Sequence, residues 1–459
     1  MQNDFLSALM KLREWYQTGE SRPVSFRLHL LKQFKKNILQ AQDEIFDALN
    51  RDLKKNREES WITEIGLVLS EIKKFEKNLK RWSKPKQVDT NIINFPSSSF
   101  IYREPLGVVF IIAPWNYPFQ LLMMPFVAAI ATGNAVVLKP SEFAPATALV
   151  MKKIIHQTFQ ESQVLYIEGD GASIIPEMIK NFHFDLIFYT GSTVVGKKIY
   201  ELAATQLTPV VLELGGKSPC IVQKDAHLKV AAKRIVMTKF SNAGQMCVAP
   251  DYILVENSIQ EILLENMIFY IKEFFGENAL ENYHYGKIIN EKQFDRLTSL
   301  LSSGEIVYGG QTIKEKLFIA PTLLKNISLD SQMMQEEIFG PILPVIPFHT
   351  KEEAMDIIKR NPNPLALYVF TSSKKDENFW IEHIPFGGGC INNAAWHLTN
   401  DALPFGGRGN SGISSYHGEF SFDVFTHKKS ILKTPTWFDP KIKYPPFQGK
   451  LKWFKKLLS

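Results

Sequence analysis

Residues 107–140 read GVVFIIAPWNYPFQLLMMPFVAAIATGNAVVLKP, two β-rich runs with a helical segment between them. The runs GVVFIIAP and NAVVLKP are short, rich in valine and isoleucine, and bounded by glycine or proline, as strands are. The segment MMPFVAAIATG between them is typical of a helix. A strand, a helix and a second strand in this order predict a βαβ unit with parallel strands.

The same alternation continues along the chain. VLYIEG (164–169) and DLIFYTG (185–191) are further candidate strands, and a helical stretch follows each of them. Together these units predict an α/β fold with a doubly wound, nucleotide-binding sheet. Before them, residues 24–82 carry apolar residues at roughly helical spacing, and residues 84–99 interrupt that pattern.

A second α/β region begins near Val211, where VVLELGGKSPCIV resembles a strand, a glycine turn and another strand. Residues 228–236 then keep the spacing of an amphipathic helix, which we expect to end around residues 242–244. Pro250 disfavours helix at Ala249, and DYILVE is typical of a strand. The sequence therefore predicts that Cys247 lies in a helix-to-strand loop.

Length and composition narrow the class of protein. A chain of 459 residues exceeds the size of one hydrophobic core, so two or three structural units are expected. The formal charge of +6 is spread along the chain and does not indicate nucleic acid. The three cysteines are too few and too far apart for a disulfide framework or a CxxC zinc site. Without a secretory signal or a bilayer-length apolar run, a cytoplasmic setting is expected.

Three side chains are candidates for catalysis. Cys247 in SNAGQMCVAP is a candidate nucleophile, which would need activation because a free thiol is mostly protonated at neutral pH. Glu213 in ELGGKSP is a candidate general base, and Asn116 in PWNYP a candidate donor to an oxyanion. The alternatives are an inert buried thiol, a glutamate that caps the glycine turn and an Asx-turn asparagine.

Other motifs indicate a dinucleotide. Lys139 and Glu142 in VVLKPSE follow a strand at the edge where such sheets bind ligands. GSTVVG (191–196) lies between a strand and a helix, which suits pyrophosphate, although its spacing departs from GxGxxG. EEIFGP (336–341) offers Glu337 for ribose hydroxyls and Phe339 for a ring face. Ordinary loops at strand ends are the alternative. None of the ten histidines forms a ligand pair on one helical face, so no metal is proposed.

The order of the motifs is more specific than any one of them. PWNYP, LKPSE, GSTVVG, ELGGKSP, GQMCVAP, EEIFGP and LPFGG occur in this order in one chain. The sequence from about residue 20 to about residue 432 resembles the aldehyde dehydrogenase superfamily. Residues 400–430, NDALPFGGRGNSGISSYHGEFSFDVFTHKKS, are similar to the class 3 branch, which includes fatty and aromatic aldehyde dehydrogenases. The short start of the chain is also like that branch and implies a homodimer.

The resemblance implies an architecture of three parts. These are a discontinuous Rossmann-type NAD(P)-binding domain of residues 1–82 and 105–211, an α/β catalytic domain of residues 212–410, and a small β bridging or oligomerisation element of residues 83–104 and 411–459 with the C-terminal tail.

The resemblance also implies the chemistry. Cys247 attacks the aldehyde carbonyl, Asn116 and the Cys247 amide stabilise the oxyanion, and hydride leaves for the nicotinamide. Water activated by Glu213 then hydrolyses the thioester, and Glu337 shares the base role. The cofactor is NAD, with NADP as the alternative, and the substrate a medium- or long-chain aliphatic or aromatic aldehyde. The implied cofactor contacts are Trp115, Lys139, Glu142, Gly191, Ser192, Gly196, Glu337 and Phe339.

Several alternatives stay open at this point. Coenzyme A instead of water would make the protein an acylating relative, and a nucleotide-independent cysteine esterase or a non-catalytic structural protein are further readings. Glu213 favours hydrolysis by water, because hydrolysis needs a base. Met246 stands where relatives usually have a smaller or polar residue, so a chain-length preference is not transferable.

The C-terminal tail has a pattern of its own. KLKWFKKLLS, residues 450–459, has the pattern of a short basic amphipathic helix. It could be a solvated tail, a cover over the substrate entrance or a dimer partner, or a weak contact with an anionic membrane.

Overall fold

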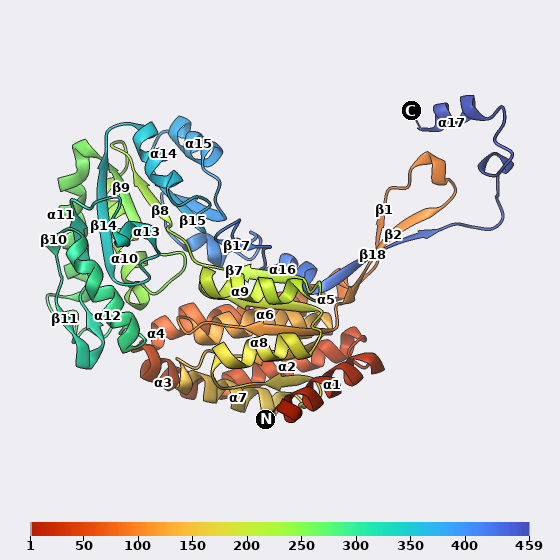
Figure 1. The fold of residues 1–459 in the computed structure, drawn as a ribbon, viewed down its shortest axis with the longest axis horizontal. Helices are drawn as coiled ribbons and strands as arrows, with labels where there is room; N and C mark the ends of the chain where they lie inside the picture. Colours follow the sequence, from red (N-terminus) through yellow and green to blue (C-terminus); the bar gives the residue numbers. More distant parts are fainter. Residues whose placement is uncertain (1, 459) are drawn as a thin grey trace.

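The computed structural model describes residues 2–458, which form two stacked α/β units and a projecting arm (Figure 1). The first unit is built on a six-stranded sheet and the second on a seven-stranded sheet. In the order of the first sheet, the strands are β17 (Gly412–Ile413), β7 (Val210–Glu213), β6 (Leu186–Thr190), β3 (Val108–Ile112), β4 (Ala135–Lys139) and β5 (Val164–Tyr166). All neighbours are parallel except β17, which pairs antiparallel with β7.

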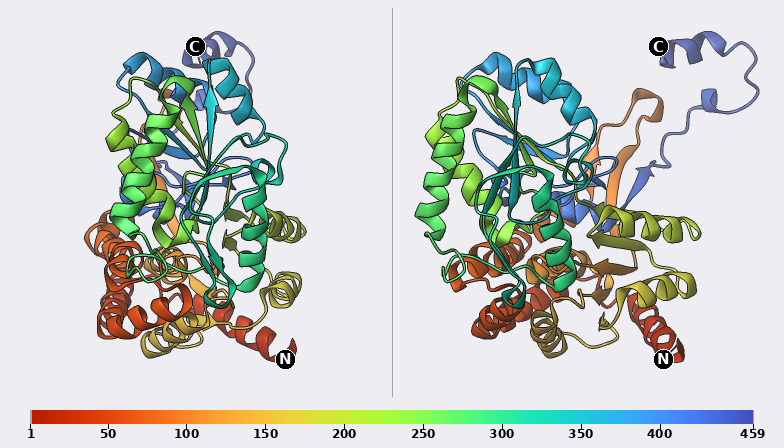
Figure 2. Two further views of the ribbon diagram at one scale, coloured as in Figure 1. Left: turned by 90° about the vertical axis from the view of Figure 1, so that its left-hand side faces the viewer. Right: turned by 60° about the vertical axis from the view of Figure 1, so that its left-hand side comes forward.

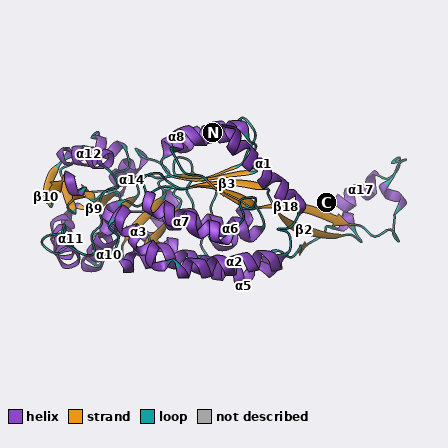
Figure 3. Ribbon diagram, turned by 90° about the horizontal axis from the view of Figure 1, so that it is seen from below, coloured by secondary structure: helices purple, strands orange, loops and turns teal. Residues whose placement is uncertain are grey.

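Helices cover both faces of the first sheet (Figure 3). On one face lie α1 (Gln2–Thr18), α8 (Gly171–Asn181) and α9 (Thr193–Ala204). On the other lie α6 (Pro118–Thr132) and α7 (Pro145–Thr158), and behind them α2 (Val24–Gln40), α3 (Gln42–Leu53), α4 (Arg57–Ser60), the π-helical turn η1 (Trp61–Ile65), α5 (Gly66–Trp82) and α16 (Gly418–Val424). Because the sheet is covered on both sides, β3 and β4 are buried along their whole length, as their continuous apolar runs predict.

The second sheet has the strands β10 (Glu305–Tyr308), β13 (Thr322–Lys325), β14 (Ile342–Phe348), β9 (Tyr252–Glu256), β8 (Pro219–Val222), β15 (Ala366–Phe370) and β16 (Gly388–Ile391) in that order. Its helices are α10 (Leu228–Phe240), α11 (Gln260–Phe275), α12 (Glu291–Leu300), α13 (Gln332–Gln335), α14 (Lys351–Lys359) and α15 (Lys374–His383). A small hairpin of β11 (Thr312–Ile313) and β12 (Phe318–Ile319) completes the unit. The helix predicted over residues 228–236 is confirmed as α10.

The arm is a three-stranded antiparallel sheet of β1 (Lys86–Val88), β2 (Ser98–Pro105) and β18 (Thr426–Lys433). It projects beyond both units and continues into a tail that ends in α17 (Leu451–Leu458), as Figure 2 shows. None of the helices in residues 2–458 is both long and apolar enough to cross a membrane.

Two expected boundaries differ from the structure. The catalytic region was expected to start at residue 212, but Leu212 and Glu213 are in β7, which belongs to the first sheet. Residues 411–424 were expected in the bridging element, yet β17 extends the first sheet and α16 packs on α5 and α6. The partner of β17 is β7, about 200 residues away, and no local pattern reports such a partner.

The motif loops of the two units come from the ends of their strands. The strand order of the first sheet reverses between β3 and β6. PWNYP follows β3, and GSTVVG follows β6. A parallel sheet binds ligands outside the carboxyl ends of its strands at such a switch point. The loops before β8, β9 and β14 of the second sheet contain three further motifs, ELGGKSP, GQMCVAP and EEIFGP.

Candidate active site

A cavity of about 740 Å³ lies where the motif loops of the two sheets meet. Its wall takes residues from both units. The predicted site residues in this wall are Trp115, Asn116, Gly191, Ser192, Glu213, Cys247, Glu337 and Phe339. Met246, which we singled out for its unusual size, lines the same cavity. The structure therefore brings all four candidate catalytic side chains together.

Cys247 lies in the predicted loop between α10 and β9. The chain leaves α10 through Asn242, Ala243 and Gly244, all of which have positive φ angles of 50–72°. A Cβ on Gly244 would lie 2.2 Å from the carbonyl oxygen of Gly340, so the cysteine loop packs directly on the EEIFGP loop. A left-handed backbone pressed against a neighbouring chain is a conformation that glycine permits.

Buried amides fix the loop before Cys247. The Gln245 side chain donates to the carbonyls of Asn242 and Lys287, both at 2.9 Å, and accepts from the Ile289 amide at 3.0 Å. Asn116, at the end of β3, donates from Nδ2 to the Gln245 carbonyl at 3.1 Å. The Asn116 amide is thereby tied to the cysteine loop, two residues from the thiol.

Two carboxylates line the same cavity wall as the thiol, and the charges of both act on it. Glu213 ends β7, and neither of its carboxylate oxygens has a hydrogen-bond partner among the described residues. Burial raises its pKa well above the ordinary value. Burial and the nearby Asp251 raise the pKa of Glu337 to about 8, while Lys217 opposes the shift. A carboxyl group with a pKa near neutrality can accept a proton at physiological pH.

The thiol itself is protonated in this environment. Burial, then the charges of Glu337 and Glu213, raise the pKa of Cys247 to about 12, and the backbone of Cys247 and Val248 opposes this. Because only the thiolate is strongly nucleophilic, the reaction requires that a neighbouring group takes the proton as the bond forms. Glu337 and Glu213 are the groups in the cavity wall suited to that.

The cofactor-side motifs converge on the carboxyl ends of β4 and β6. Ser192, Thr193 and Val194 at the start of α9 line the cavity, and Ser192 caps the helix by accepting from the Val195 amide at 3.4 Å. The rings of Trp115 and Phe339 meet edge to face at 5.4 Å.

Lys139, Glu142 and Gly196 lie outside the cavity wall itself. Lys139, the last residue of β4, forms an ion pair of 3.1 Å with Glu142. Gly196 is inside α9, and a Cβ there would lie 2.5 Å from Leu214 Cδ2. The missing Cβ of Gly196 therefore leaves room for Leu214 beside α9.

Sequence reasoning missed the residue that joins three motif loops. Lys217 of ELGGKSP is buried and forms an ion pair with Asp251, which follows the cysteine loop. It also donates to the carbonyls of Met333 at 2.7 Å and Glu336 at 3.0 Å. The motif was the only signal, because its partners are distant in sequence. Among the described residues, no group of three or more His, Cys, Asp or Glu side chains is arranged to hold a metal ion.

Comparison with known proteins agrees with this arrangement. The model of the aldehyde dehydrogenase family matches residues 2–431, most of the chain. The chain belongs to the aldehyde dehydrogenase family. It is 45% identical over 445 residues to the 4,4'-diaponeurosporen-aldehyde dehydrogenase of Staphylococcus aureus, covering 96% of each protein. It is 43% identical to aldehyde dehydrogenase family 3 member H1 of Arabidopsis thaliana, covering 98% of the chain and 94% of that protein.

A solved structure, described as the substrate-bound state of Staphylococcus aureus AldH, matches with a TM-score of 0.97 and 44% identity over 99% of both chains. This aldehyde dehydrogenase therefore has the α/β fold of its family and is similar to class 3 members. It is an oxidoreductase that oxidises aldehydes with NAD or NADP. The acylating, esterase and structural readings are not favoured.

Proposed function

We propose that this aldehyde dehydrogenase works through a covalent thioester on Cys247. The observation that carries the proposal is the meeting of Cys247, Asn116, Glu213 and Glu337 in one cavity wall. Cys247 Sγ attacks the carbonyl carbon of the aldehyde, and its proton passes to one of the two carboxylates. The electron pair of the C=O bond moves to oxygen, where the Asn116 side chain and the Cys247 amide stabilise it.

The residues around the cavity fit a dinucleotide. The start of α9 borders the cavity, and a helix N-terminus favours phosphate. Lys197 lines the same side and adds positive charge, while Trp115 and Phe339 offer ring faces. The bound cofactor supplies one chemical function, acceptance of the hydride from the thiohemiacetal carbon. The thioester that remains is cleaved by water, whose proton passes to Glu213 or Glu337, and the acid leaves as Cys247 is restored.

We propose that the first sheet and its helices, including β7, β17 and α16, form the cofactor domain. The second sheet forms the catalytic domain and the arm the bridging element. On this division the site lies between two domains, a common location for ligand sites.

We propose that the substrate is a medium- or long-chain aliphatic or an aromatic aldehyde. The cavity wall includes apolar side chains that suit a hydrocarbon, namely Leu67, Leu121, Met246, Leu398 and Phe405. The Staphylococcus aureus relative is named for 4,4'-diaponeurosporen-aldehyde. A panel from acetaldehyde through long-chain alkanals to benzaldehyde tests this. Values of kcat/KM that rise with chain length support it, and a preference for acetaldehyde contradicts it.

We propose that the arm pairs two copies of the chain as a homodimer. Its outer strand, β18, is exposed from His427 to Lys433 and projects from the body (Figure 1). Exposed edge strands are rarely left uncovered in stable proteins. Light scattering of the native protein should give twice the mass of one chain. The I431D/L432D variant should give the mass of one chain. The same substitution at an exposed residue far from the arm, I262D, is the control; a monomeric native protein contradicts the proposal.

The charge pattern of the C-terminal tail suits a second partner, the surface of an anionic membrane. After Asp439 the sequence has six lysines and no acidic residue. Leu451 and Trp453 of α17 are 64% and 59% exposed between these lysines. We propose weak peripheral contact through this pattern, which a basic amphipathic helix supports. Truncation after Gly449 should abolish co-sedimentation with anionic vesicles, and unchanged co-sedimentation contradicts it.

A further inference from the structure

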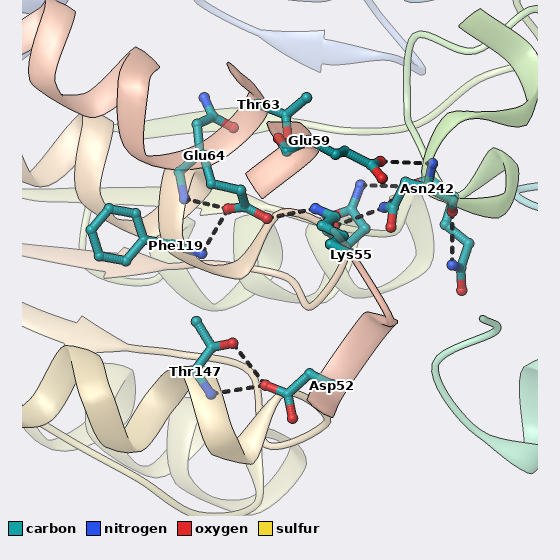
Figure 4. A network of polar contacts seen from close by, with 11 residues as sticks. Asp52, Lys55, Glu59, Thr63, Glu64, Phe119, Thr147 and Asn242 are labelled. Atoms are coloured by element: carbon teal, nitrogen blue, oxygen red, sulfur yellow. Dashed lines mark hydrogen bonds and ion pairs between the residues drawn. The ribbon is translucent and has the colours of Figure 1, made fainter. Parts of the chain in front are cut away.

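A buried ion pair of Lys55 and Glu64, shown in Figure 4, contacts the turn that contains Asn116. The side chains of Lys55 and Glu64 are both 0% exposed, and Lys55 Nζ is 2.5 Å from Glu64 Oε1. Lys55 lies between α3 and α4, and Glu64 in η1. Lys55 Nζ also donates to the backbone carbonyl of Asn116 at 3.0 Å and lies 3.8 Å from the ring centroid of Tyr117. The ammonium group thus contacts both Glu64 and the PWNYP turn.

Glu64 holds the other end of the same turn. Its Oε2 accepts from the backbone amides of Phe119 at 3.1 Å and Gln120 at 2.9 Å. These are among the first amides of α6, which no side chain of its own N-cap residue satisfies. A carboxylate at this position satisfies unpaired donors and interacts favourably with the helix dipole. Burial raises the pKa of Glu64, and Lys55 and the two amides oppose that shift.

The carbonyl of Asn116 receives a second donor from the cysteine loop. Asn242 Nδ2 lies 2.8 Å from it, and the Asn242 backbone amide donates to Glu59 at 3.0 Å. Asn242 has a positive φ of 51°, so these contacts help to hold a strained backbone five residues before the nucleophile. The turn and the loop are therefore connected on both sides of the Asn116 side chain.

Burying an ion pair in a core costs the desolvation free energy of both charges. Replacing such a pair by apolar residues is often neutral or stabilising, so its presence is not explained by stability. A hydrogen-bonded ion pair can instead fix one arrangement of the groups it contacts. Here the contacted groups are the backbone atoms on either side of the Asn116 side chain.

We propose that Lys55 and Glu64 are positioning residues that hold the Asn116 amide where the oxyanion forms. This inference rests on the oxyanion role of Asn116 proposed above. Displacing a donor by even a fraction of an ångström weakens its bond to the transition state, because such donors act through preorganised geometry. The ion pair therefore acts on formation of the thiohemiacetal and not on the thiol itself.

Two reactions of Cys247 distinguish an effect on the oxyanion from an effect on the thiol. Attack on an aldehyde forms a C–S bond and places an electron pair on the carbonyl oxygen. Alkylation by iodoacetamide forms a C–S bond and releases iodide without any oxyanion. A positioning role changes the first reaction and spares the second, whereas a disrupted cysteine loop changes both.

The experiment measures both reactions in K55M, E64Q, N116A and the double variant K55M/N116A. E64Q keeps an oxygen for the α6 amides and serves if K55M does not fold. Asp52 is the matched control, because it accepts from the amides of Ala146 and Thr147 at the start of α7, also in Figure 4, without contacting the Asn116 turn. D52N therefore weakens a buried helix cap of the same kind.

K55M should lower kcat/KM for the aldehyde about tenfold or more, and E64Q by a smaller factor in the same direction. Iodoacetamide labelling of Cys247, followed by peptide mass spectrometry, should stay within about twofold of native. The kcat/KM of the double variant should lie within about threefold of that of N116A, because both changes act through one amide. D52N should keep native kcat/KM.

Each other result has a definite meaning. An unchanged kcat/KM in K55M and E64Q, a parallel loss of alkylation, or full additivity with N116A overturns the positioning role while leaving the oxyanion role of Asn116 intact. A native kcat/KM in N116A overturns the proposed oxyanion role itself, and the present inference with it.

Discussion

A Cβ atom on Gly215 would lie 1.8 Å from Oε2 of Glu337. The carboxylate therefore occupies the space beside this glycine, and the ELGGKSP loop forms one wall of its pocket. Glycine is required here by the neighbouring side chain, since the φ angle of Gly215 is not in the left-handed region. The place of Glu337 beside Cys247 depends on an atom that is missing from Gly215.

Substitution G215A should move Glu337 with little loss of stability. The atom that a methyl group meets is the end of a flexible side chain, so the carboxylate can swing away. We expect kcat to fall about tenfold or more, with less than about 1.5 kcal/mol lost from the free energy of unfolding. Steady-state kinetics and urea unfolding measure the two quantities. In an E337Q background G215A should have little further effect on kcat, and an independent loss there would contradict the account.

Substitution E213Q should separate hydride transfer from release of the acid. Glutamine keeps the size of the side chain but cannot take a proton from water. We expect kcat to fall about 100-fold or more while the first turnover still gives a burst of reduced cofactor. Stopped-flow absorbance measures burst and steady state together. Loss of the burst in proportion to kcat would place Glu213 in an earlier step.

The pH dependence of turnover should report Glu337. With a pKa of about 8, its carboxyl group is mostly protonated below that pH and becomes a base above it. The rate of acid release should therefore rise from about pH 6 to about pH 9, and E337Q should flatten this rise. Steady-state kinetics in buffers of constant ionic strength measure this pH dependence. A native profile in E337Q would assign the base role to Glu213 alone.

Cys247 should show a separate pH dependence when no cofactor is bound. Burial holds the pKa of the thiol near 12, so the thiolate fraction grows with pH over the whole accessible range. Iodoacetamide labelling should accelerate steadily from about pH 7 to about pH 10 without a plateau. A plateau near neutral pH would mean that the thiol is already ionised.

Substitution K217M should unfold the region where the motif loops meet. It leaves Asp251 buried without its cation and removes the bonds to Met333 and Glu336. Breaking a buried pair costs about 3 kcal/mol or more. The exposed pair of Lys359 and Asp356 is the control, and K359M should change the free energy of unfolding by less than about 0.5 kcal/mol. Urea unfolding measures the change in the free energy of unfolding of each variant. Equal changes in K217M and K359M would contradict the account.

The fold class was predictable because its signals are local, and the candidate catalytic side chains were proposed from the order of short motifs along the chain. The continuous apolar runs of β3 and β4 indicate strands buried on both faces, and Pro250 with the preceding glycine loop places Cys247 between a helix and a strand. Long-range pairing was not predictable. Gly412 pairs with Glu213 across about 200 residues, so no local pattern placed β17 in the first sheet.

Buried charges were equally hidden from the sequence. Lys55, Glu64 and Lys217 resemble the charged surface positions of helices and loops, and only the fold reveals that each is enclosed. A charged residue gives no local sign of a partner that is 34 or more residues away, as Asp251 is from Lys217. The network around Asn116 therefore had to be read from the structure.

The most direct test of the central claim follows the acyl group on Cys247. Intact-protein mass spectrometry of E213Q, quenched after mixing with NAD and a long-chain aldehyde, should show a mass increase of one acyl group, and C247A in the same background should show none and produce no reduced cofactor. Reduced cofactor formed by C247A, or acylation at another residue, would contradict the account.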